Sequence, residues 1–242
     1  MSATLLRVAQ VSKHFGGFSA LSEVSVEIAQ GERFGLIGPN GSGKTTLINC
    51  ISGSLRNDGG SIVFDGNEIS GLSAFERTRL GIARSFQIPR PFSSMSVLEN
   101  LIVPLEYVVH RRSLHVHDTR AEAMQILESM GLADKADTPS NRLTQVELRK
   151  LELARAMAAR PRLLISDEAM AGLSSTEVEE VVAILRKLNA SGITVIMIEH
   201  IMRAVMGFSQ RVICLDAGRI ICEGTPESIV KDPEVQKAYL GA

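Results

Sequence analysis

The octapeptide at residues 38–45 has a composition that suits the binding of phosphate. It reads Gly-Pro-Asn-Gly-Ser-Gly-Lys-Thr and fits the pattern of a glycine, four residues, a second glycine, a lysine and a serine or threonine. Glycines let the backbone curl with its N–H groups pointing inward, while Lys44 can reach the β- and γ-phosphates of a nucleotide and the Thr45 hydroxyl can bind Mg²⁺. We expect a nucleoside triphosphate to be held by Gly38, Asn40, Gly41, Ser42, Gly43, Lys44, Thr45 and Thr46.

The segments on either side of this octapeptide predict a strand before it and a helix after it. Residues 33–37 are short, apolar and bounded by glycine, and residues 46–51 favour a helix. The N-terminus of a helix carries a partial positive charge, which stabilises bound phosphate. The order strand, loop, helix therefore favours a phosphate-binding loop over a chance glycine-rich turn.

Two adjacent carboxylates, Asp167 and Glu168, follow a buried-strand pattern at residues 162–166. An acidic residue at the carboxyl end of a strand beside a phosphate loop supplies the partner that a metal ion needs. We expect Asp167 to hold Mg²⁺ through water, and Glu168 to orient or deprotonate the attacking water. The alternative for either carboxylate is a solvated strand end with no catalytic role.

His200 and Gln87 end two further predicted strands, at residues 193–198 and 81–86. Ligands of α/β sheets bind at the carboxyl ends of the parallel strands, so both side chains are expected near the phosphate loop. His200 can donate a hydrogen bond to a γ-phosphate, and Gln87 can offer its amide to water or Mg²⁺. An isolated histidine is more often structural, and the spacing alone leaves both roles open.

The remaining patterns predict an α/β fold with two additions. Strands at residues 5–11 and 22–28, joined by a turn at 13–17, indicate an antiparallel β subdomain. Residues 88–160 have helical patterns only, with N-caps at Ser96 and Asp118 and a kink expected at Pro104. We therefore expect a nucleotide-binding core that includes the β subdomain and a separate helical subdomain. The core comprises residues 1–86 and 161–242, and the helical subdomain comprises residues 87–160.

Composition excludes several classes of protein. The 242 residues carry a net charge of −1, which gives no support for a nucleic-acid binder with a basic face. Three scattered cysteines in apolar surroundings indicate buried thiols in a reducing compartment rather than disulfides or a zinc site. No signal peptide is evident, and no uncharged apolar run reaches the roughly 18 residues of a membrane-spanning helix. These observations predict a soluble, cytoplasmic chain.

The order of these motifs along the whole chain resembles that of the ATPase subunits of ABC transporters. The matching pieces are Lys13-His14-Phe15, the octapeptide, Gln87, residues 143–147, Asp167-Glu168, residues 171–174 and His200. The resemblance is greatest to the ATPases of branched-chain amino acid importers. The pieces that carry this narrower resemblance are residues 12–17, 83–87 and 198–200 and the tail from Gly224 to Gly241.

The resemblance implies a P-loop NTPase fold, ATP and Mg²⁺ as cofactors, and roles for individual residues. Phe15 would stack on adenine, and His200 would be the switch histidine that touches the γ-phosphate. Glu168 would be the general base. Gln87 would lie in the loop that links the nucleotide to the membrane subunits and would serve both the metal and the attacking water. The helical subdomain would contact those membrane subunits.

One motif departs from the family pattern. The signature loop, which closes over the ATP held by the opposite subunit of a dimer, usually reads Leu-Ser-Gly-Gly-Gln. This chain has Thr144, which keeps the hydroxyl, but it has Val146 at the position of the glycine that approaches the phosphate, and then Glu147. A β-branched side chain crowds the oxyanion and resists unusual backbone angles. Smaller departures in neighbouring motifs are Ala169, Ser174 and Ile201.

An intact phosphate loop beside an altered signature predicts an asymmetric dimer with a nonidentical ATPase. The resemblance implies further partners, namely transmembrane permease subunits and, indirectly, a solute-binding protein, but no nucleic acid. The chain would then lie at the inner face of the cell membrane and power the import of branched-chain amino acids or related small polar solutes. Three alternatives are a catalytically weak regulatory or structural subunit, an ATPase of lipopolysaccharide export, and a soluble ABC protein acting on DNA or ribosomes. The last would carry coiled-coil insertions or tandem cassettes, which this sequence lacks.

Overall fold

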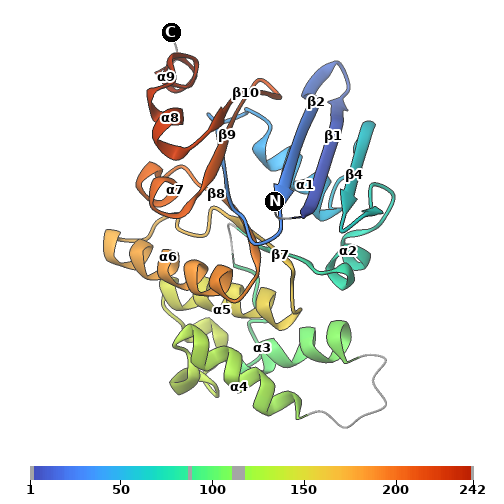
Figure 1. Ribbon diagram of the computed structural model, residues 1–242. Helices are drawn as coiled ribbons and strands as arrows, with labels where there is room; N and C mark the ends of the chain where they lie inside the picture. The colour runs from blue at the N-terminus through green and yellow to red at the C-terminus, as the bar shows by residue number, and fades with distance from the viewer. Residues whose placement is uncertain (1–2, 87–88, 111–117, 241–242) are drawn as a thin grey trace.

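The computed structural model describes residues 3–86, 89–110 and 118–240 (Figure 1). Its strands are β1 (Thr4–Phe15), β2 (Phe18–Ala29), β3 (Arg33–Ile37), β4 (Gly59–Phe64), β5 (Asn67–Glu68), β6 (Ile82–Ser85), β7 (Leu163–Asp167), β8 (Thr194–Ile198), β9 (Arg211–Asp216) and β10 (Arg219–Gly224). Its α-helices are α1 (Lys44–Ser52), α2 (Ala74–Leu80), α3 (Val97–Pro104), α4 (Thr119–Met130), α5 (Gln145–Ala158), α6 (Ser175–Ala190), α7 (Met202–Phe208), α8 (Pro226–Lys231) and α9 (Pro233–Leu240). No helix among these residues is both long and apolar enough to cross a membrane.

The larger sheet has six strands in the order β10-β9-β3-β8-β7-β6. Strands β9, β3, β8, β7 and β6 run parallel, and β10 pairs antiparallel with β9 at one edge. Both faces are covered, because Val195 and Met197 of β8 belong to one buried cluster while Ile196 and Ile198 belong to another. This explains why β8 is a continuous apolar run, as expected of a central parallel strand.

The smaller sheet is antiparallel, with the order β2-β1-β4-β5, and it forms the predicted β subdomain. The expected turn at residues 13–17 was placed too widely, because β1 continues to Phe15, β2 begins at Phe18, and these two residues pair. Asp58 accounts for the difference. Its carboxylate accepts hydrogen bonds from Lys13 Nζ at 2.6 Å and from the His14 backbone N–H at 2.7 Å, which extends the hairpin to the Gly16-Gly17 turn.

Every regular element between Val97 and Ala158 in the described part of the chain is helical. The N-caps at Ser96 and Asp118 are confirmed by hydrogen bonds from the Glu99 and Ala121 backbone N–H groups. At Pro104 the α-helix gives way to one turn of π-helix, η1 (Leu105–Val109). Proline lacks an N–H and crowds the preceding turn, so a change of helical geometry at that point is expected. Two short 3₁₀ turns, η2 (Ala133–Lys135) and η3 (Ser140–Arg142), lead to α5.

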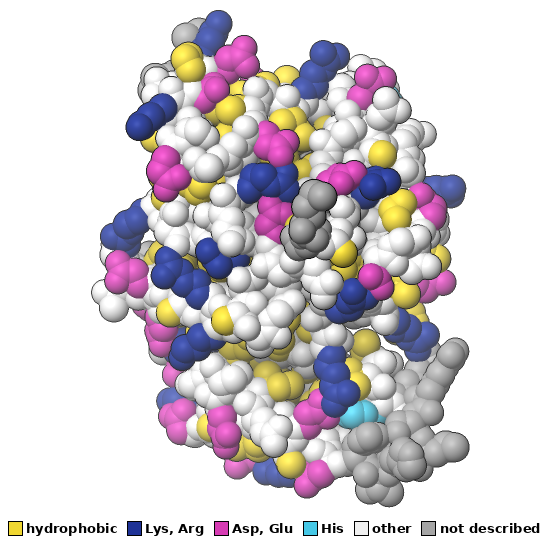
Figure 2. Space-filling view, in the orientation of Figure 1, with side chains coloured by type: hydrophobic (Ala, Val, Ile, Leu, Met, Phe, Trp, Pro, Cys, Tyr) yellow, Lys and Arg dark blue, Asp and Glu magenta, His cyan; other side chains and the backbone are white. Residues whose placement is uncertain are grey.

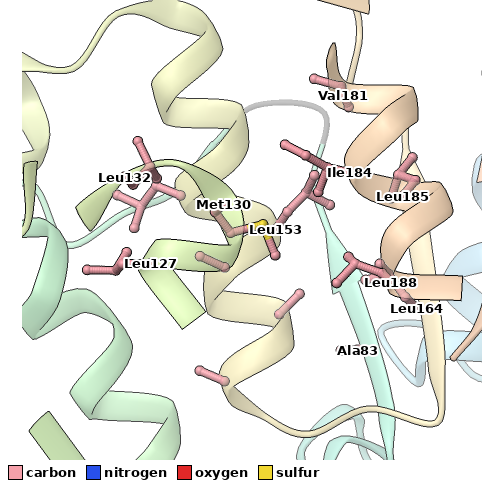
Figure 3. Close-up of a cluster of buried hydrophobic side chains, with 14 of the residues drawn as sticks. Ala83, Leu127, Met130, Leu132, Leu153, Leu164, Val181, Ile184, Leu185 and Leu188 are labelled. Carbon is pink, nitrogen blue, oxygen red and sulfur yellow. The ribbon is translucent and has the colours of Figure 1, made fainter. Parts of the chain in front are cut away.

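One buried cluster joins the helical segment to the sheet (Figure 3). It combines Leu127 and Met130 of α4 and Leu153 of α5 with Leu164 of β7 and Leu185 of α6, all of them 2% exposed or less. The other face of the sheet packs on α1 and on the antiparallel sheet. The helical segment is therefore anchored to the same strands whose ends carry the predicted site. On the face shown in Figure 2, the charged side chains of both signs are interspersed.

Candidate nucleotide site

The phosphate loop follows β3 and runs directly into α1. Two of its glycines are required by geometry. Gly38 has φ 148°, and a Cβ atom there would lie 2.1 Å from the Leu215 backbone oxygen. Gly43, which caps α1 with φ 106°, would place a Cβ atom 2.7 Å from the Ala20 backbone oxygen. The loop is thus pressed between β2 and the end of β9, and a larger residue at either position would force it out of place.

The interior of the loop is suited to an anion. Lys44 is only 6% exposed, and its Nζ donates to the carbonyl oxygens of Gly38 at 2.7 Å and Pro39 at 2.9 Å. Burial lowers the pKa of Lys44, while Glu168, Cys214 and Asp167 oppose this shift. Ser42 Oγ is buried and has no hydrogen-bond partner among the described residues. A buried ammonium and an unsatisfied hydroxyl inside a glycine cradle fit the phosphate groups of a nucleotide.

A cavity of about 280 Å³ opens in front of this loop. Its lining brings together most residues predicted from the sequence, namely Phe15, Asn40, Gly41, Ser42, Gly43, Lys44, Thr45, Thr46, Glu168 and His200, and it adds Phe18 and Ala20. Phe18 was missed by the sequence analysis. It pairs with Phe15 across the hairpin, and the two rings are 63% and 51% exposed. Exposed aromatic faces beside a phosphate site suit the stacking of a base. The sequence signal for this pair was an aromatic residue on each side of Gly16-Gly17.

Glu168 and His200 meet at the edge of this cavity. Glu168 Oε1 lies 2.8 Å from His200 Nε2, although the two residues are 32 positions apart and follow different strands. Glu168 has a positive φ of 47°, and its backbone N–H donates to the Ile198 oxygen at 2.9 Å. This backbone geometry turns its carboxylate toward the next strand end. The pair can therefore hold and move a proton beside the place where a terminal phosphate would sit.

Asp167 is tied to a residue that the sequence analysis did not single out for the site. Arg84 of β6 places Nη2 2.5 Å from Asp167 Oδ2 and Nη1 2.6 Å from Asn49 Oδ1 on α1. The side chains of Arg84 and Asp167 are only 10% and 9% exposed. Arg84 thus connects the phosphate-loop helix with the proposed metal carboxylate, and its guanidinium also lies 5.2 Å from the Phe86 ring centroid. Nothing in the local sequence marks this long-range contact.

Two of the three residues expected to hold Mg²⁺, Thr45 and Asp167, lie in the part of the chain that the structure describes. Thr45 lines the cavity, and Asp167 ends β7 beside Glu168. Gln87 lies outside the described residues. A hydroxyl, a carboxylate and phosphate oxygens are hard oxygen ligands of the kind that Mg²⁺ prefers, so the residues present fit this ion.

The signature residues lie at the N-terminal end of α5, with Thr144 as its N-cap, and do not line this cavity. Thr144 caps the helix in a capping box, with its hydroxyl accepting from the Glu147 N–H and the Glu147 carboxylate accepting from the Thr144 N–H at 2.8 Å. The Thr144 N–H lowers the pKa of Glu147, whose charge is thus held at the helix N-terminus. Val146 adopts helical geometry in the first turn, without a positive φ. The expectation that Val146 would conflict with an unusual backbone conformation is therefore wrong. The remaining argument against Val146 is the bulk of its side chain near a bound phosphate.

Glu199 is a buried carboxyl directly behind the Glu168–His200 pair. It is 2% exposed, and its Oε1 accepts from the Met170 N–H at 3.0 Å. Burial raises the pKa of Glu199 to about 7; Glu168 adds to the shift, while the Met170 and His200 N–H groups and Arg149 oppose it. The folded chain therefore takes up a proton that the unfolded chain lacks between about pH 4.5 and pH 7.

We expect Glu199→Gln to change how stability depends on pH. Because the pKa of Glu199 is raised in the folded state, this group contributes stability that is fully present below the pKa of the unfolded chain and is lost as pH rises through about 7. The loss in the free energy of unfolding is on the order of 3 kcal/mol. Glutamine keeps an acceptor for Met170 but cannot titrate. In urea unfolding from pH 4.5 to 8.5, the free energy of unfolding of the variant should increase relative to that of the wild type as pH rises. A difference in the free energy of unfolding between Glu199→Gln and the wild type that stays constant over this pH range would contradict the prediction.

Comparison with known proteins agrees with this geometry. Residues 21–171 match the family model described as ABC transporter, and residues 219–242 match the model described as branched-chain amino acid ATP-binding cassette transporter. The chain is 36% identical over 253 residues to the high-affinity branched-chain amino acid transport ATP-binding protein BraF of Pseudomonas aeruginosa, covering 100% of this chain and 99% of that protein. It is also 36% identical over 255 residues to the LivG protein of Escherichia coli, with the same coverage.

Solved structures show the same fold. The ADP conformation of MJ1267, an ATP-binding cassette of an ABC transporter, superposes with a TM-score of 0.90 at 31% identity over the full length of both chains. A dimeric ABC transporter cassette, MJ0796, has a TM-score of 0.82 at 27% identity, covering 92% of this chain and 99% of that one. The phosphate loop, the Glu168–His200 pair and the full-length relatives lead to one conclusion. The chain belongs to the family of nucleotide-binding ATPase subunits of ABC transporters.

Proposed function

We propose that this ATPase powers the import of branched-chain amino acids or related small polar solutes. The assignment of ATP hydrolysis rests on one observation: the phosphate loop, Glu168 and His200 line the same cavity. The substrate class is supported by the BraF and LivG relatives over their full length and by the separate match of residues 219–242. The match of residues 219–242 lies outside the altered signature loop.

Each side chain of the cavity has a role in this proposal. Phe15 and Phe18 offer aromatic surface to the base, and the glycine cradle with Lys44 binds the phosphates. Glu168 accepts a proton from the attacking water, and His200 orients that carboxylate and contacts the terminal phosphate. Mg²⁺, held by Thr45 and Asp167 with Gln87, would neutralise charge on the phosphates. Arg84 keeps the Asp167 carboxylate in place.

The partner in the dimer is proposed to be a nonidentical ATPase. Dimeric cassettes occur among the structural relatives, and the family resemblance implies that the signature loop of one subunit closes the site of the other. This chain offers a complete phosphate-loop half with Lys44, Glu168 and His200, but it presents Val146 at the first turn of α5. A valine side chain at that point keeps the helix N–H groups away from a phosphate oxygen. We therefore infer that the better catalytic site uses this chain's phosphate loop and the partner's signature.

The helical subdomain, residues 87–160, is proposed to dock on permease subunits, with residues 1–86 and 161–242 as the catalytic core. A groove between the two parts supports this assignment. It is lined by Ala83, Arg84 and Phe86 on the core side and by Pro104 and Arg155 on the helical side. Docking there would place the chain at the inner face of the membrane, and a solute-binding protein would act through the permease.

Co-purification tests these partners. A tag on this chain should recover two membrane subunits and a second, different ATPase from its native cells, and ATP turnover of the reconstituted complex should rise when leucine and the solute-binding protein are added. Glu168→Gln should assemble equally well but show no such rise. Recovery of the chain as a homodimer with membrane subunits that respond to a lipid rather than to an amino acid would contradict the proposal.

A further inference from the structure

The last two helices are packed against the strand that leads into the phosphate loop. Ile229 of α8 and Val235 of α9 are buried in one cluster with Ile37, the residue directly before Gly38. Asp232 fixes the junction between the helices, because its Oδ1 accepts from the Val235 N–H at 3.2 Å. In Figure 1, α8 and α9 lie beside β9 and β10 near the C-terminus. The tail is therefore an anchored part of the fold.

From this anchored helix, Tyr239 reaches the root of the phosphate loop. Its Oη accepts a hydrogen bond from the Gly38 backbone N–H at 2.9 Å, across 201 residues of sequence. Burial raises the pKa of Tyr239, although the Gly38 N–H opposes this, so the phenol is a neutral hydroxyl at physiological pH. Tyr239 does not line the nucleotide cavity. Its effect on the cavity must therefore pass through Gly38.

Gly38 connects Tyr239 to the lysine that binds phosphate. Its N–H is held by Tyr239, and its carbonyl oxygen accepts from Lys44 Nζ at 2.7 Å. The residue is buried and packs so closely against the Leu215 backbone oxygen that it leaves no room for a Cβ atom. A second hydrogen bond holds the loop nearby, where the Gly218 N–H donates to the Ser42 backbone carbonyl oxygen at 2.9 Å. The loop is thus braced from outside at its first residue and again in its middle.

We propose that Tyr239 is a positioning residue of the nucleotide site, through which the C-terminal helix fixes the first peptide of the phosphate loop. The hydroxyl holds Gly38 in the conformation from which Lys44 and the loop N–H groups meet the phosphates. A loop that is already ordered binds its ligand more tightly, because less conformational freedom is lost on binding. This inference rests on the assignment of residues 38–45 as the nucleotide site and is independent of the transported solute.

Tyr239→Phe tests the proposal by removing one oxygen atom. Without its acceptor the buried Gly38 N–H is left unsatisfied. We therefore expect ATP affinity to fall about three- to ten-fold, which is the change in affinity that the loss of one hydrogen bond usually causes. Turnover at saturating ATP should change less than about two-fold, giving a KM effect without a matching kcat effect. Hydrogen exchange of the Gly38 amide in the nucleotide-free protein should accelerate by a similar factor. Tyr107→Phe is the matched control, because Tyr107 is the other tyrosine of the chain and is 66% exposed.

The readouts separate this role from a merely structural one. A weakened tail would lower the melting temperature without a selective change at the Gly38 amide, and that result would overturn the proposal. Wild-type ATP affinity in Tyr239→Phe would overturn it as well. Failure of the wild-type protein itself to bind ATP would instead contradict the assignment of the nucleotide site. Val235→Ala, which loosens the packing of α9 but keeps the hydroxyl, should speed Gly38 exchange less than Tyr239→Phe does.

Discussion

Glu168→Gln is expected to lower ATP turnover by about 10²- to 10⁴-fold while ATP binding persists. The carboxylate lies 2.8 Å from His200 in the cavity before the phosphate loop, where it can take a proton from water. General-base catalysis contributes a factor of this size. Glutamine has nearly the same shape and can still contact His200, but it cannot accept the proton.

The measurement is single-turnover hydrolysis in the assembled complex, with ATP affinity determined separately. Glu199→Gln is the matched control, since Glu199 is a carboxyl at the end of the neighbouring strand β8 but is buried and does not line the cavity. It should retain most of the turnover. Equal losses in both variants, or a Glu168→Gln protein that turns over like wild type, would remove Glu168 from the role of general base.

Arg84→Met is expected to cost about 3 kcal/mol in the free energy of unfolding. The substitution leaves Asp167 as a carboxylate that is 9% exposed and has lost the guanidinium 2.5 Å away. Removing one partner of a buried ion pair is strongly destabilising, because the remaining charge is uncompensated. The Asn49 oxygen on α1 loses its donor in the same step.

Urea unfolding of a double-mutant cycle measures this effect. Arg84→Met combined with Asp167→Asn should recover much of the loss, since the second substitution removes the stranded charge. Arg7→Gln provides the control, because its pair with Glu27 at 2.7 Å has side chains that are 57% and 55% exposed, and exposed pairs contribute below about 1 kcal/mol. Additive effects of Arg84→Met and Asp167→Asn would show that the two side chains do not act as a pair.

The strand ends of the site could be predicted from sequence, because each depends on a local pattern. Strand β8 is a continuous apolar run that stops at a polar residue. Strand β7 runs into polar residues in the same way, and β3 stops at Gly38 of the phosphate loop. Parallel strands place their carboxyl ends on one rim, so Lys44, Glu168 and His200 were expected to meet, and they line one cavity. The N-cap at Ser96 was equally local and is confirmed.

The contacts that support the site could not be predicted, because their partners lie far apart in the sequence. Arg84 and Asp167 are 83 residues apart, and Gly38 and Tyr239 are 201 residues apart. The hairpin was mispredicted for the same reason, since its tip depends on Asp58. Helix α7 was missed because it has only seven residues and its N-cap residue, Ile201, offers no side-chain cap. Such features are set by tertiary contact rather than by local preference.

We propose that this chain provides a complete phosphate-loop half and a weak signature half. In a homodimer of the chain, both ATP molecules would face Val146 of the opposite copy. Val146→Gly removes that side chain from the first turn of α5, where the capping box of Thr144 and Glu147 already fixes the helix. The glycine therefore costs little helix stability, less than about 1 kcal/mol.

ATP turnover of the purified chain alone, compared between wild type and Val146→Gly at matched concentration, tests this claim most directly. We expect the wild type to hydrolyse ATP slowly and without cooperativity. Val146→Gly should be about ten-fold faster and cooperative in ATP, which corresponds to an activation barrier that is lower by about 1.4 kcal/mol. Wild-type protein that alone hydrolyses ATP cooperatively, at the same rate as Val146→Gly, would contradict the claim.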